Sequence, residues 1–477
     1  MPQTQTSTTG VFKRRRQVLP AVLMRAGTSK GLFIQEHHLP ASQADWAPAI
    51  LAAMGSADAD PRQVDGLGGA TSTTSKVAVV GPSSVPGADV DYTFVQVGVG
   101  SSSVDLSGSC GNMASGVGPF AVEEGMVKVR APSTCGGIHS VDVRIFNTNT
   151  RRLYIETVAV DAEGHVIEDG NYTIPGVATP GSEIKIGFIE PAGSMTGRLF
   201  PSGNRVDVLR VPLPNTTRVR DLWPVRTTLI DAANPFVVID AASLPPELRT
   251  GLSFTSPVPG IITPILSDAD LAPHLAAVEA IRRIGAVRMG LASSVDEAAL
   301  TKGTPKAAVV WPPAPPRAVD FGIGDSVQPD IQVLAFSMGK PHPTLQLTGG
   351  VCLATAVCVP GTVAWDAAHA SAGFDSPRNG LPPSPERTPS PASENGEEEK
   401  KNMRLSPSPL KVVDTTAISK IVRHVRISHR KGTIDVGCVV SLSADEDGNG
   451  DRGVLVERCT VSRTARRLFE GRAYYYS

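Results

Sequence analysis

The 477-residue chain has few aromatic residues, no cysteine pair with zinc-site spacing and no long apolar run. Aromatic residues make up 5% of it, against 46 glycines and 40 prolines, which is typical of many short strands and turns rather than of a helical bundle. None of the six cysteines forms a C-x-x-C pair, and no apolar stretch is long enough to span a bilayer. The 45 basic and 46 acidic residues nearly cancel. We therefore expect neither nucleic acid nor a membrane as a partner.

The N-terminal residues 1–16 lack the apolar core of a secretory signal. They carry Ser, Thr and four basic residues, and the first acidic residue is Glu36, so they faintly resemble a mitochondrial transit peptide. We interpret 1–16 as a disordered tail, because a strand pattern begins near Val18. The expected location is cytoplasmic, with mitochondrial as the weaker alternative.

The stretch 107–120 is the feature around which we interpret the rest of the chain. It is a loop of small residues holding Cys110, followed by small and apolar residues that suit a tightly packed helix. In such a loop, backbone N–H groups converge at a helix N-terminus and favour a bound anion. The alternative is a buried helix start in which Cys110 is only a small hydrophobic residue.

Two further polar segments precede apolar strands. Five consecutive hydroxyl residues at 71–75 lead to Lys76, without the Gly-Lys-Ser/Thr spacing of a Walker A loop. A lysine in this place is either a solvated edge charge or a functional residue. The turn between the predicted strands of 18–34 holds Arg25, Thr28, Ser29 and Lys30.

The pattern of the first half recurs after a polar connection at 214–224. Residues 227–239 have the strand, turn, strand layout of 21–34, and 346–360 echo the loop and helix at 107–122. We interpret this as an internal duplication, with domains at 17–222 and 223–477 and last strands that could cross back. One site at the junction would then face two helix N-termini, which suits a ligand with several negative charges.

Two other segments bear on the site. Residues 333–344 run from a strand into a loop with Lys340 and His342, where the histidine is as readily structural as functional. Residues 375–410 contain Ser-Pro and Thr-Pro pairs and a charged run, so we predict a disordered insertion without chemistry, whose Ser and Thr are potential phosphate acceptors. An acidic run at 445–450 begins like a calcium loop but has Val456 at its twelfth position, so we expect no metal there.

Seven motifs in order resemble the PrpF-type family of aconitate and methylitaconate isomerases, which has the diaminopimelate-epimerase-like fold. They lie at 24–31, 69–78, 107–113, 192–204, 231–236, 337–342 and 464–468. The resemblance implies an α+β fold of two similar domains, each a mostly antiparallel sheet wrapped around a central helix, with the site in the cleft between them. It also implies a cofactor-independent shift of a C=C bond in a small unsaturated polycarboxylic acid.

The resemblance places the family's proton-transfer lysine at Lys76 and its cysteine at Cys110. Two departures stand out. Ser109 occurs where the family commonly has Asn, and residues 428–432 replace a more usual His-Pro-Ser-Gly, which leaves the role of His429 open.

The residues also suit this chemistry by themselves, because a dienolate needs donors aimed at its carboxylate oxygens. Lys76 needs desolvation or neighbouring cations to act as the base, and Cys110 is the competing base. The predicted substrate-binding residues are Arg25, Thr28, Ser29, Lys30, Thr73, Ser75, Gly111, Asn112, Met113, Asn234, Lys340, His342, Thr348 and Gly349.

The leading hypothesis is a cofactor-independent aconitate isomerase interconverting cis- and trans-aconitate, with 2-methylaconitate and 4-oxalomesaconate as alternative substrates. The insertion at 375–410 suggests a eukaryotic, fungal source. A cysteine-dependent epimerase is disfavoured, because the repeat puts Thr348 opposite Cys110 and Cys352 about a turn further on. A non-catalytic carboxylate-binding protein is another alternative. The expected partner is the small polycarboxylate, with a homodimer as one option for assembly.

Overall fold

The computed structural model describes residues 15–127, 133–135, 138–212, 222–253, 268–313, 328–370, 419–443 and 453–476. The predicted insertion at 375–410 lies outside these ranges. So does the predicted tail at 1–16, apart from Arg15 and Arg16. Arg16 belongs to the first strand rather than to a tail, because it pairs with Tyr476 of the last strand. The predicted domain limits at 222 and 223 stay a prediction.

The first half of the described sheet contains β1 (Arg16–Ala26), β2 (Ser29–Gln35), β3 (Lys76–Pro82), β4 (Val90–Val97), β5 (Val104–Asp105), β6 (Ser133–Cys135), β7 (Ile138–Asn147), β8 (Arg152–Val160), β9 (Ile184–Ile189) and β10 (Asp207–Val211). Strands β1 and β2 form an antiparallel hairpin, and β2 runs parallel to β3. Strand β3 pairs antiparallel with β4, which runs parallel to β7. Antiparallel pairing then continues from β7 through β8 to β9.

The second half contains β11 (Trp223–Asp231), β12 (Pro235–Asp240), β13 (Lys306–Trp311), β14 (Ile331–Ser337), β15 (Lys340–Pro341), β16 (Ser419–His429), β17 (Gly432–Leu442), β18 (Val454–Arg463) and β19 (Ala465–Tyr476). Its pairing repeats that of the first half: β11 with β12 antiparallel, β12 with β13 parallel, β13 with β14 antiparallel and β14 with β16 parallel. Antiparallel pairs again follow, from β16 through β17 to β18. Strands β3 and β13 are therefore counterparts.

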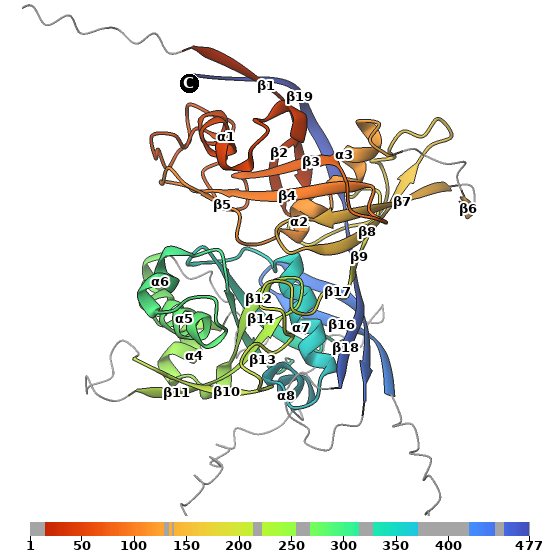
Figure 1. The fold of residues 1–477 in the computed structure, drawn as a ribbon. Coiled ribbons are helices and arrows are strands. Elements are labelled where there is room, and N and C mark those ends of the chain that lie inside the picture. Colours follow the sequence, from red (N-terminus) through yellow and green to blue (C-terminus); the bar gives the residue numbers. More distant parts are fainter. Residues whose placement is uncertain are drawn as a thin grey trace, which may run out of the picture.

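Three antiparallel pairings connect the halves into one network (Figure 1). Strand β9 pairs with β18, and β10 pairs with β11. Strand β19 crosses back to pair with β1 over almost their whole length. Strand β10, the last strand of the first half, therefore pairs with the second half, and β19, the last strand of the chain, pairs with the first half. These pairings fix the two halves against each other.

The helices lie on both faces of the strands. They are α1 (Trp46–Met54), α2 (Gly111–Ala114), α3 (Val117–Glu123), α4 (Pro246–Leu252), α5 (Asp268–Arg288), α6 (Val295–Leu300), α7 (Leu347–Cys358) and α8 (Val363–His369), with 3-10 turns η1 (Glu36–His38), η2 (Gln43–Asp45) and η3 (Ala241–Ser243). Helices α2 and α3 pack against strands of the first half, and α7 packs against β16, β17 and β18. Helix α5, which the apolar spacing at 268–289 predicts, packs against β10, β12 and β13.

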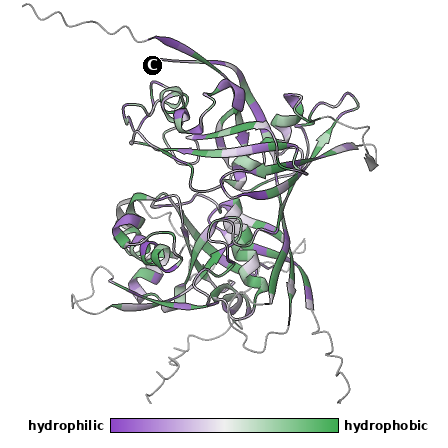
Figure 2. Ribbon diagram, viewed as in Figure 1, coloured by the Kyte–Doolittle hydropathy of each residue, from purple (hydrophilic) through white to green (hydrophobic). Residues whose placement is uncertain are grey.

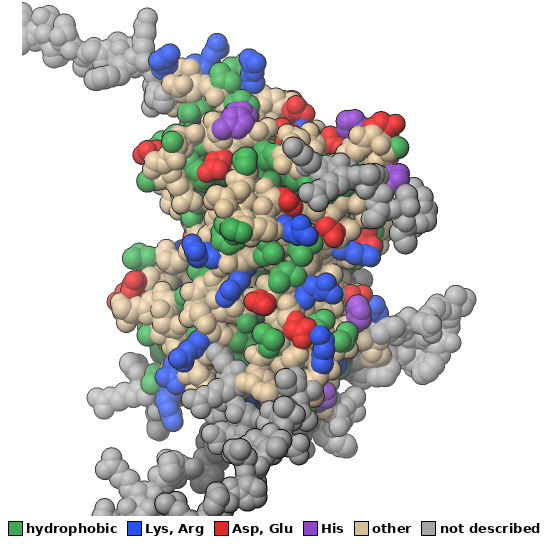
Figure 3. Space-filling model, turned by 45° about the vertical axis from the view of Figure 1, so that its right-hand side comes forward, with side chains coloured by type: hydrophobic (Ala, Val, Ile, Leu, Met, Phe, Trp, Pro, Cys, Tyr) green, Lys and Arg blue, Asp and Glu red, His purple; other side chains and the backbone are tan. Residues whose placement is uncertain are grey.

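One large apolar cluster runs through both halves. It includes Met113 and Phe120 of the first half and Phe236, Leu347 and Val351 of the second. Hydrophobic and hydrophilic residues alternate along many strands, so that one face of each strand can be buried (Figure 2). On the face that Figure 3 shows, acidic and basic side chains are dispersed rather than gathered into one patch of a single sign.

Among the described helices, none alone has the length and apolar composition to cross a membrane. Helices α7 and α8, bent by 69° at the break between them, meet that test together by length and composition only. Every residue of α7 is buried in the protein core.

Candidate active site at the junction of the two halves

A pocket opens where the two halves meet, with an empty volume of about 580 Å³ that includes open solvent. The first half contributes Ser29, Ser72, Thr73, Lys76, Phe94, Gln96, Asp105, Gly108, Ser109, Cys110, Gly111 and Asn112. The second half contributes Gly303, Lys306, Ser337, Met338, His342, Gln346, Leu347 and Thr348.

Two helix N-termini meet in this pocket. Helix α2 begins after Cys110, and α7 begins after Gln346. A Cβ atom on Gly111 would lie only 2.7 Å from Cδ2 of Leu347, so glycine permits the close approach of the two helices. The first residues of both helices line the pocket, where their amides favour a bound carboxylate.

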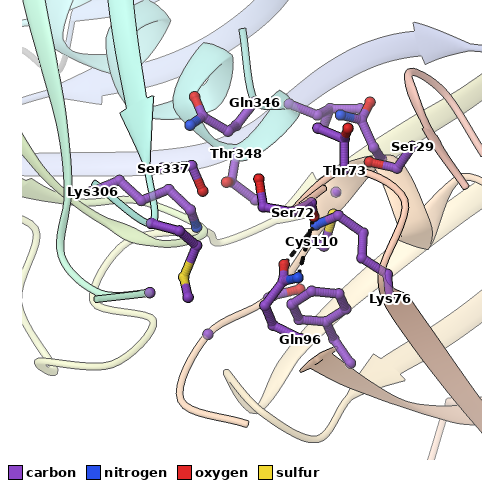
Figure 4. Close-up of a pocket in the computed structure, with 18 of the residues that line it drawn as sticks. Ser29, Ser72, Thr73, Lys76, Gln96, Cys110, Lys306, Ser337, Gln346 and Thr348 are labelled. Carbon is purple, nitrogen blue, oxygen red and sulfur yellow. Dashed lines mark hydrogen bonds between the residues drawn. The ribbon is translucent and has the colours of Figure 1, made fainter. Parts of the chain in front are cut away.

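Lys76 is the first residue of β3 and is only 8% exposed. Its Nζ atom donates to Oε1 of Gln96 at 3.0 Å and lies 3.5 Å from Sγ of Cys110. The ammonium also lies 4.9 Å from the ring centre of Phe94. Nε2 of Gln96 donates to the carbonyl oxygen of Ser75 at 3.0 Å, which turns the amide oxygen toward the lysine. The amine is therefore held in place on several sides (Figure 4).

The Cys110 thiol is the acidic partner of this lysine. Burial alone would raise the pKa of Cys110, but the positive charge of Lys76, the backbone N–H of Met113 and the charge of Lys306 together bring it below the ordinary value. The Met113 amide, predicted to bind substrate, thus serves the cysteine sulfur instead. Its side chain is fully buried in the core.

His342 is a neutral hydrogen-bonding group in the pocket. Its Nδ1 atom accepts from the backbone N–H of Thr344 at 3.2 Å, which leaves the ring proton on Nε2. Burial is the largest cause that lowers the pKa of His342 to about 3, and the positive charges of Lys76 and Lys306 lower it further. At neutral pH the ring therefore carries no charge and can donate from Nε2.

Eight of the sixteen predicted site residues line the pocket. They are Ser29, Thr73, Lys76, Cys110, Gly111, Asn112, His342 and Thr348. The other eight are outside its lining: Arg25, Thr28, Lys30, Ser75, Met113, Asn234, Lys340 and Gly349.

Several of the residues outside the lining hold the surrounding backbone. Nη1 of Arg25 donates to the carbonyl oxygen of Thr464 at 2.8 Å, so its charge is used to anchor the crossing strand. The hydroxyl of Ser75 donates to Oε1 of Gln63 at 2.6 Å. Oδ1 of Asn234 accepts from the backbone N–H of Ser109 at 3.4 Å. These three side chains support the site from behind.

The remaining residues outside the lining point elsewhere. Lys340 is exposed and Lys30 is half-buried. Gly349 faces Phe236, because a Cβ atom there would lie 2.8 Å from the ring. The hydroxyl of Thr28 lies 3.3 Å from that of Thr344 and links the two halves.

The structure adds residues that the sequence reasoning missed. Lys306 is the first residue of β13, as Lys76 is the first residue of β3. The sequence contains a signal for this correspondence, because residues 76–80 read Lys-Val-Ala-Val-Val and residues 306–310 read Lys-Ala-Ala-Val-Val. Gln96 has no such signal, because its role depends on β4 lying beside β3. Helix α2 begins after Cys110, whereas α7 begins after Gln346, so that Thr348 lies in the first turn of α7.

Arg463 lies behind the pocket at the end of β18. Its Nε atom donates to Oδ1 of Asn112 at 3.2 Å, and Nδ2 of Asn112 donates to the hydroxyl of Thr28 at 3.2 Å. Burial lowers the pKa of Arg463 to about 10, against the opposing charge of Tyr172. This chain of hydrogen bonds fixes Asn112 at the start of α2. His429, whose role the sequence left open, is also buried, and burial together with the charge of Arg463 lowers its pKa to about 4.

Cys352 does not form a second thiol in the pocket. Its sulfur lies 2.8 Å from the carbonyl oxygen of Ala232 and 2.9 Å from that of Asn234. Burial raises its pKa. In the described part of the chain, no group of three or more His, Cys, Asp or Glu side chains is arranged to hold a metal ion.

The fold and the pocket together define a site for acid–base chemistry on a small anion. The amine of Lys76, the neutral imidazole of His342 and two helix N-termini surround one cavity. Such a set can bind a carboxylate, remove a proton from an adjacent carbon and stabilise the charge that develops.

Comparison with known proteins agrees with this class. The family model described as PrpF protein matches residues 16–374. The putative isomerase YraM of Bacillus subtilis is 38% identical over 341 residues, covering 72% of this chain and 84% of the relative. The 2-methyl-aconitate isomerase of Shewanella oneidensis is 37% identical over 354 residues, covering 72% and 82%. The 3-methylitaconate isomerase of Eubacterium barkeri is 36% identical over 368 residues, covering 76% and 88%.

A solved structure, that of a methylitaconate-delta-isomerase, superposes with a TM-score of 0.60 at 30% identity and covers 96% of each chain. The mixed α/β fold of this chain resembles that enzyme. The chain belongs to the PrpF family and is an isomerase that shifts carbon–carbon double bonds.

Proposed function

We propose that this isomerase interconverts cis- and trans-aconitate by moving the C=C bond along the carbon chain. The observation that carries the proposal is that two lysine amines and two helix N-termini surround one pocket. A tricarboxylate has enough negative charge to engage both lysines and both helix N-termini. The names of the relatives concern methylaconitate, methylitaconate and oxalomesaconate, which are small unsaturated carboxylic acids like aconitate.

In the proposed reaction, the substrate's carboxylates bind the amides of Gly111 and Asn112 and the hydroxyls of Ser29 and Thr73. The amine of Lys76 exchanges a proton with an allylic carbon next to a carboxylate. Removing that proton creates a dienolate, whose charge grows on the carboxylate oxygens. Donors fixed before the reaction stabilise this charge without reorganising.

Cys110 acts in this proposal as a charge partner for Lys76 rather than as the base. Its lowered pKa favours the thiolate, and its sulfur lies 3.5 Å from the amine of Lys76. The neutral Nε2–H of His342 supplies one more donor to the bound anion.

The substrate is tested by incubating the purified chain with cis-aconitate, 2-methylaconitate and 4-oxalomesaconate in turn, in deuterated buffer, and recording proton spectra. We expect trans-aconitate to form from cis-aconitate, with deuterium at the allylic positions, and the highest kcat/KM for aconitate. Lys76→Ala should abolish this reaction.

Other outcomes identify the alternatives. A higher kcat/KM for the methyl or the oxalo acid would reassign the substrate within the family. Exchange at the α-carbon of an amino acid, lost in Cys110→Ser, would indicate an epimerase. Binding of these acids without any exchange would indicate a carboxylate-binding protein.

A further inference from the structure

Lys306 occupies the place in the second half that Lys76 occupies in the first. Each lysine is the first residue of its strand, β3 or β13. Each strand runs parallel to the second strand of its hairpin, with Lys76 opposite Gly31 and Lys306 opposite Phe236. Because the order of pairing is the same in both halves, the duplication delivers two lysines to one pocket.

The two amines enter the pocket from opposite sides. In Figure 4, Lys306 comes from the second half and Lys76 from the first, and both nitrogen atoms point toward the space between them. Each ammonium also lies over an aromatic ring, at 4.9 Å from the ring centre of Phe94 for Lys76 and 5.9 Å from that of Phe236 for Lys306. The arrangement is therefore similar on both sides in its strand, its ring and its direction.

The two amines differ in what holds them. Lys76 has hydrogen bonds to Gln96 and Cys110. Within the described ranges, no hydrogen bond or ion pair engages the amine of Lys306. Burial lowers the pKa of Lys306 to about 8, with Cys110 and Asp105 opposing the shift and Lys76 adding to it. At neutral to mildly alkaline pH both of its protonation states are populated, which a group that accepts and donates protons requires.

The proposed reaction needs proton transfer at two carbons that are two bonds apart. Lys76 is held by Gln96, Cys110 and Phe94 on the first half's side of the pocket, opposite Lys306. We propose that Lys306 is a second catalytic acid–base residue, which exchanges a proton with the substrate carbon that Lys76 does not serve. This inference rests on the proposed function and extends it.

The step balances without any further reactant. At one carbon the C–H bond breaks, its proton moves to a neutral amine, and its electron pair becomes the new C=C bond. The electron pair of the old C=C bond forms a C–H bond at the far carbon with a proton from the other lysine's ammonium. The two amines thereby exchange protonation states, and proton exchange with water restores them before the next turnover.

The test compares Lys306→Met, Lys306→Arg and Lys76→Met, with Lys302→Met as the control at an exposed position four residues away. Isomerisation and deuterium incorporation at each of the two carbons are followed by proton spectra in deuterated buffer. Melting curves and substrate binding by calorimetry verify that each variant folds and binds.

We expect Lys306→Met to slow isomerisation about 100-fold or more, the usual scale for losing a general acid or base. Deuterium should still enter one substrate carbon in Lys306→Met and the other in Lys76→Met. Lys306→Arg should bind substrate but isomerise as poorly as Lys306→Met, because arginine keeps the charge and does not lose its proton. Lys302→Met should stay within about twofold of the wild type, as exposed surface changes usually do.

Three results would overturn the inference while leaving the proposed function intact. The first is isomerisation by Lys306→Met within a few-fold of the wild type. The second is an active Lys306→Arg, which would assign the lysine to charge alone. The third is loss of exchange at both carbons in Lys306→Met with binding retained. A wild-type protein that exchanges no hydrogens of any of the three acids would instead refute the proposed function, and the inference with it.

Discussion

Nζ of Lys76 lies 3.5 Å from Sγ of Cys110, although 34 positions separate the two residues along the chain. One belongs to the start of a strand and the other precedes a helix, and the packing of α2 against β3 within the first half brings them together. The lysine charge acts on the cysteine sulfur through this contact, so removing that charge alters the ionisation of the thiol.

The coupling predicts that Lys76→Met raises the pKa of the Cys110 thiol. In the wild type, burial raises this pKa, and the charges of Lys76 and Lys306 together with the Met113 N–H outweigh burial. Without Lys76 the largest cause that lowers this pKa is gone, so burial dominates and we expect the pKa of Cys110 to rise. The pH dependence of iodoacetamide labelling, read by mass spectrometry of the Cys110 peptide, measures the shift. Lys340→Met, at an exposed lysine, is the control, and an unchanged profile in Lys76→Met would contradict the prediction.

Cys352→Ala should leave catalysis nearly intact. The Cys352 sulfur contacts the carbonyl oxygens of Ala232 and Asn234 and lies outside the pocket lining. We expect kcat/KM within about threefold of the wild type, with a loss of about 1 kcal/mol in the free energy of unfolding from the small cavity. Kinetics with aconitate and urea denaturation measure the two effects. A 100-fold loss of activity in a folded Cys352→Ala protein would instead support two-thiol chemistry.

Gly27→Ala should destabilise the protein more than Gly87→Ala. Both glycines have positive φ, 53° and 85°, so an added Cβ strains the backbone at either place. At Gly27 the Cβ would also lie 2.3 Å from Oδ1 of Asn112, whereas at Gly87 nothing lies within 4 Å. We expect a loss of about 1 kcal/mol for Gly87→Ala and about 2–4 kcal/mol for Gly27→Ala.

Urea denaturation compares the two glycine variants, and kinetics add a second measurement. Because Asn112 lines the pocket, Gly27→Ala should also lower kcat/KM, while Gly87→Ala should not. Equal losses of stability in the two variants would show that the contact with Asn112 relaxes freely.

Glu156→Gln should remove a pH dependence of stability. The Glu156 carboxyl is fully buried; burial raises its pKa well above 4.5, and the hydrogen bond from Gly118 only partly opposes this. Between 4.5 and the raised value, the folded protein holds the proton more tightly than the unfolded chain. Its contribution to the free energy of unfolding therefore falls as pH rises, by up to about 1.4 kcal/mol per unit.

Denaturation at pH 5 and pH 8 tests whether the contribution of Glu156 to the free energy of unfolding falls as pH rises. We expect the wild type to lose more stability between these values than Glu156→Gln does. Glu163→Gln, at an exposed position, should behave as the wild type. A Glu156→Gln protein with the wild-type pH slope would contradict the assignment.

Much of the site was predictable from local sequence. The small-residue loop at 107–113, the hydroxyl run before Lys76 and the loop with His342 are short patterns whose composition already favours an anion at a helix start. The hairpin that begins each half was predictable from strand and turn residues alone. These hairpins are β1 with β2 and β11 with β12.

For other residues around the site, no local sequence pattern shows whether the side chain lines the pocket or lies outside it. Arg25 and Thr28 lie in a motif with Ser29, yet only Ser29 lines the pocket, because successive side chains of a strand or turn point in different directions. Gln96 and Arg463 are ordinary strand residues in the sequence, and their roles arise from the strands that lie beside them.

The sequence by itself determined the kinds of groups in this isomerase and the segments that carry them, because helix starts, turns and strand entries depend on neighbouring residues. Only the tertiary structure decided that Lys306 shares a pocket with Lys76 and that Arg463 lies behind Asn112. Those contacts join residues hundreds of positions apart, and they depend on how the apolar faces of the two halves pack and which strands cross between them.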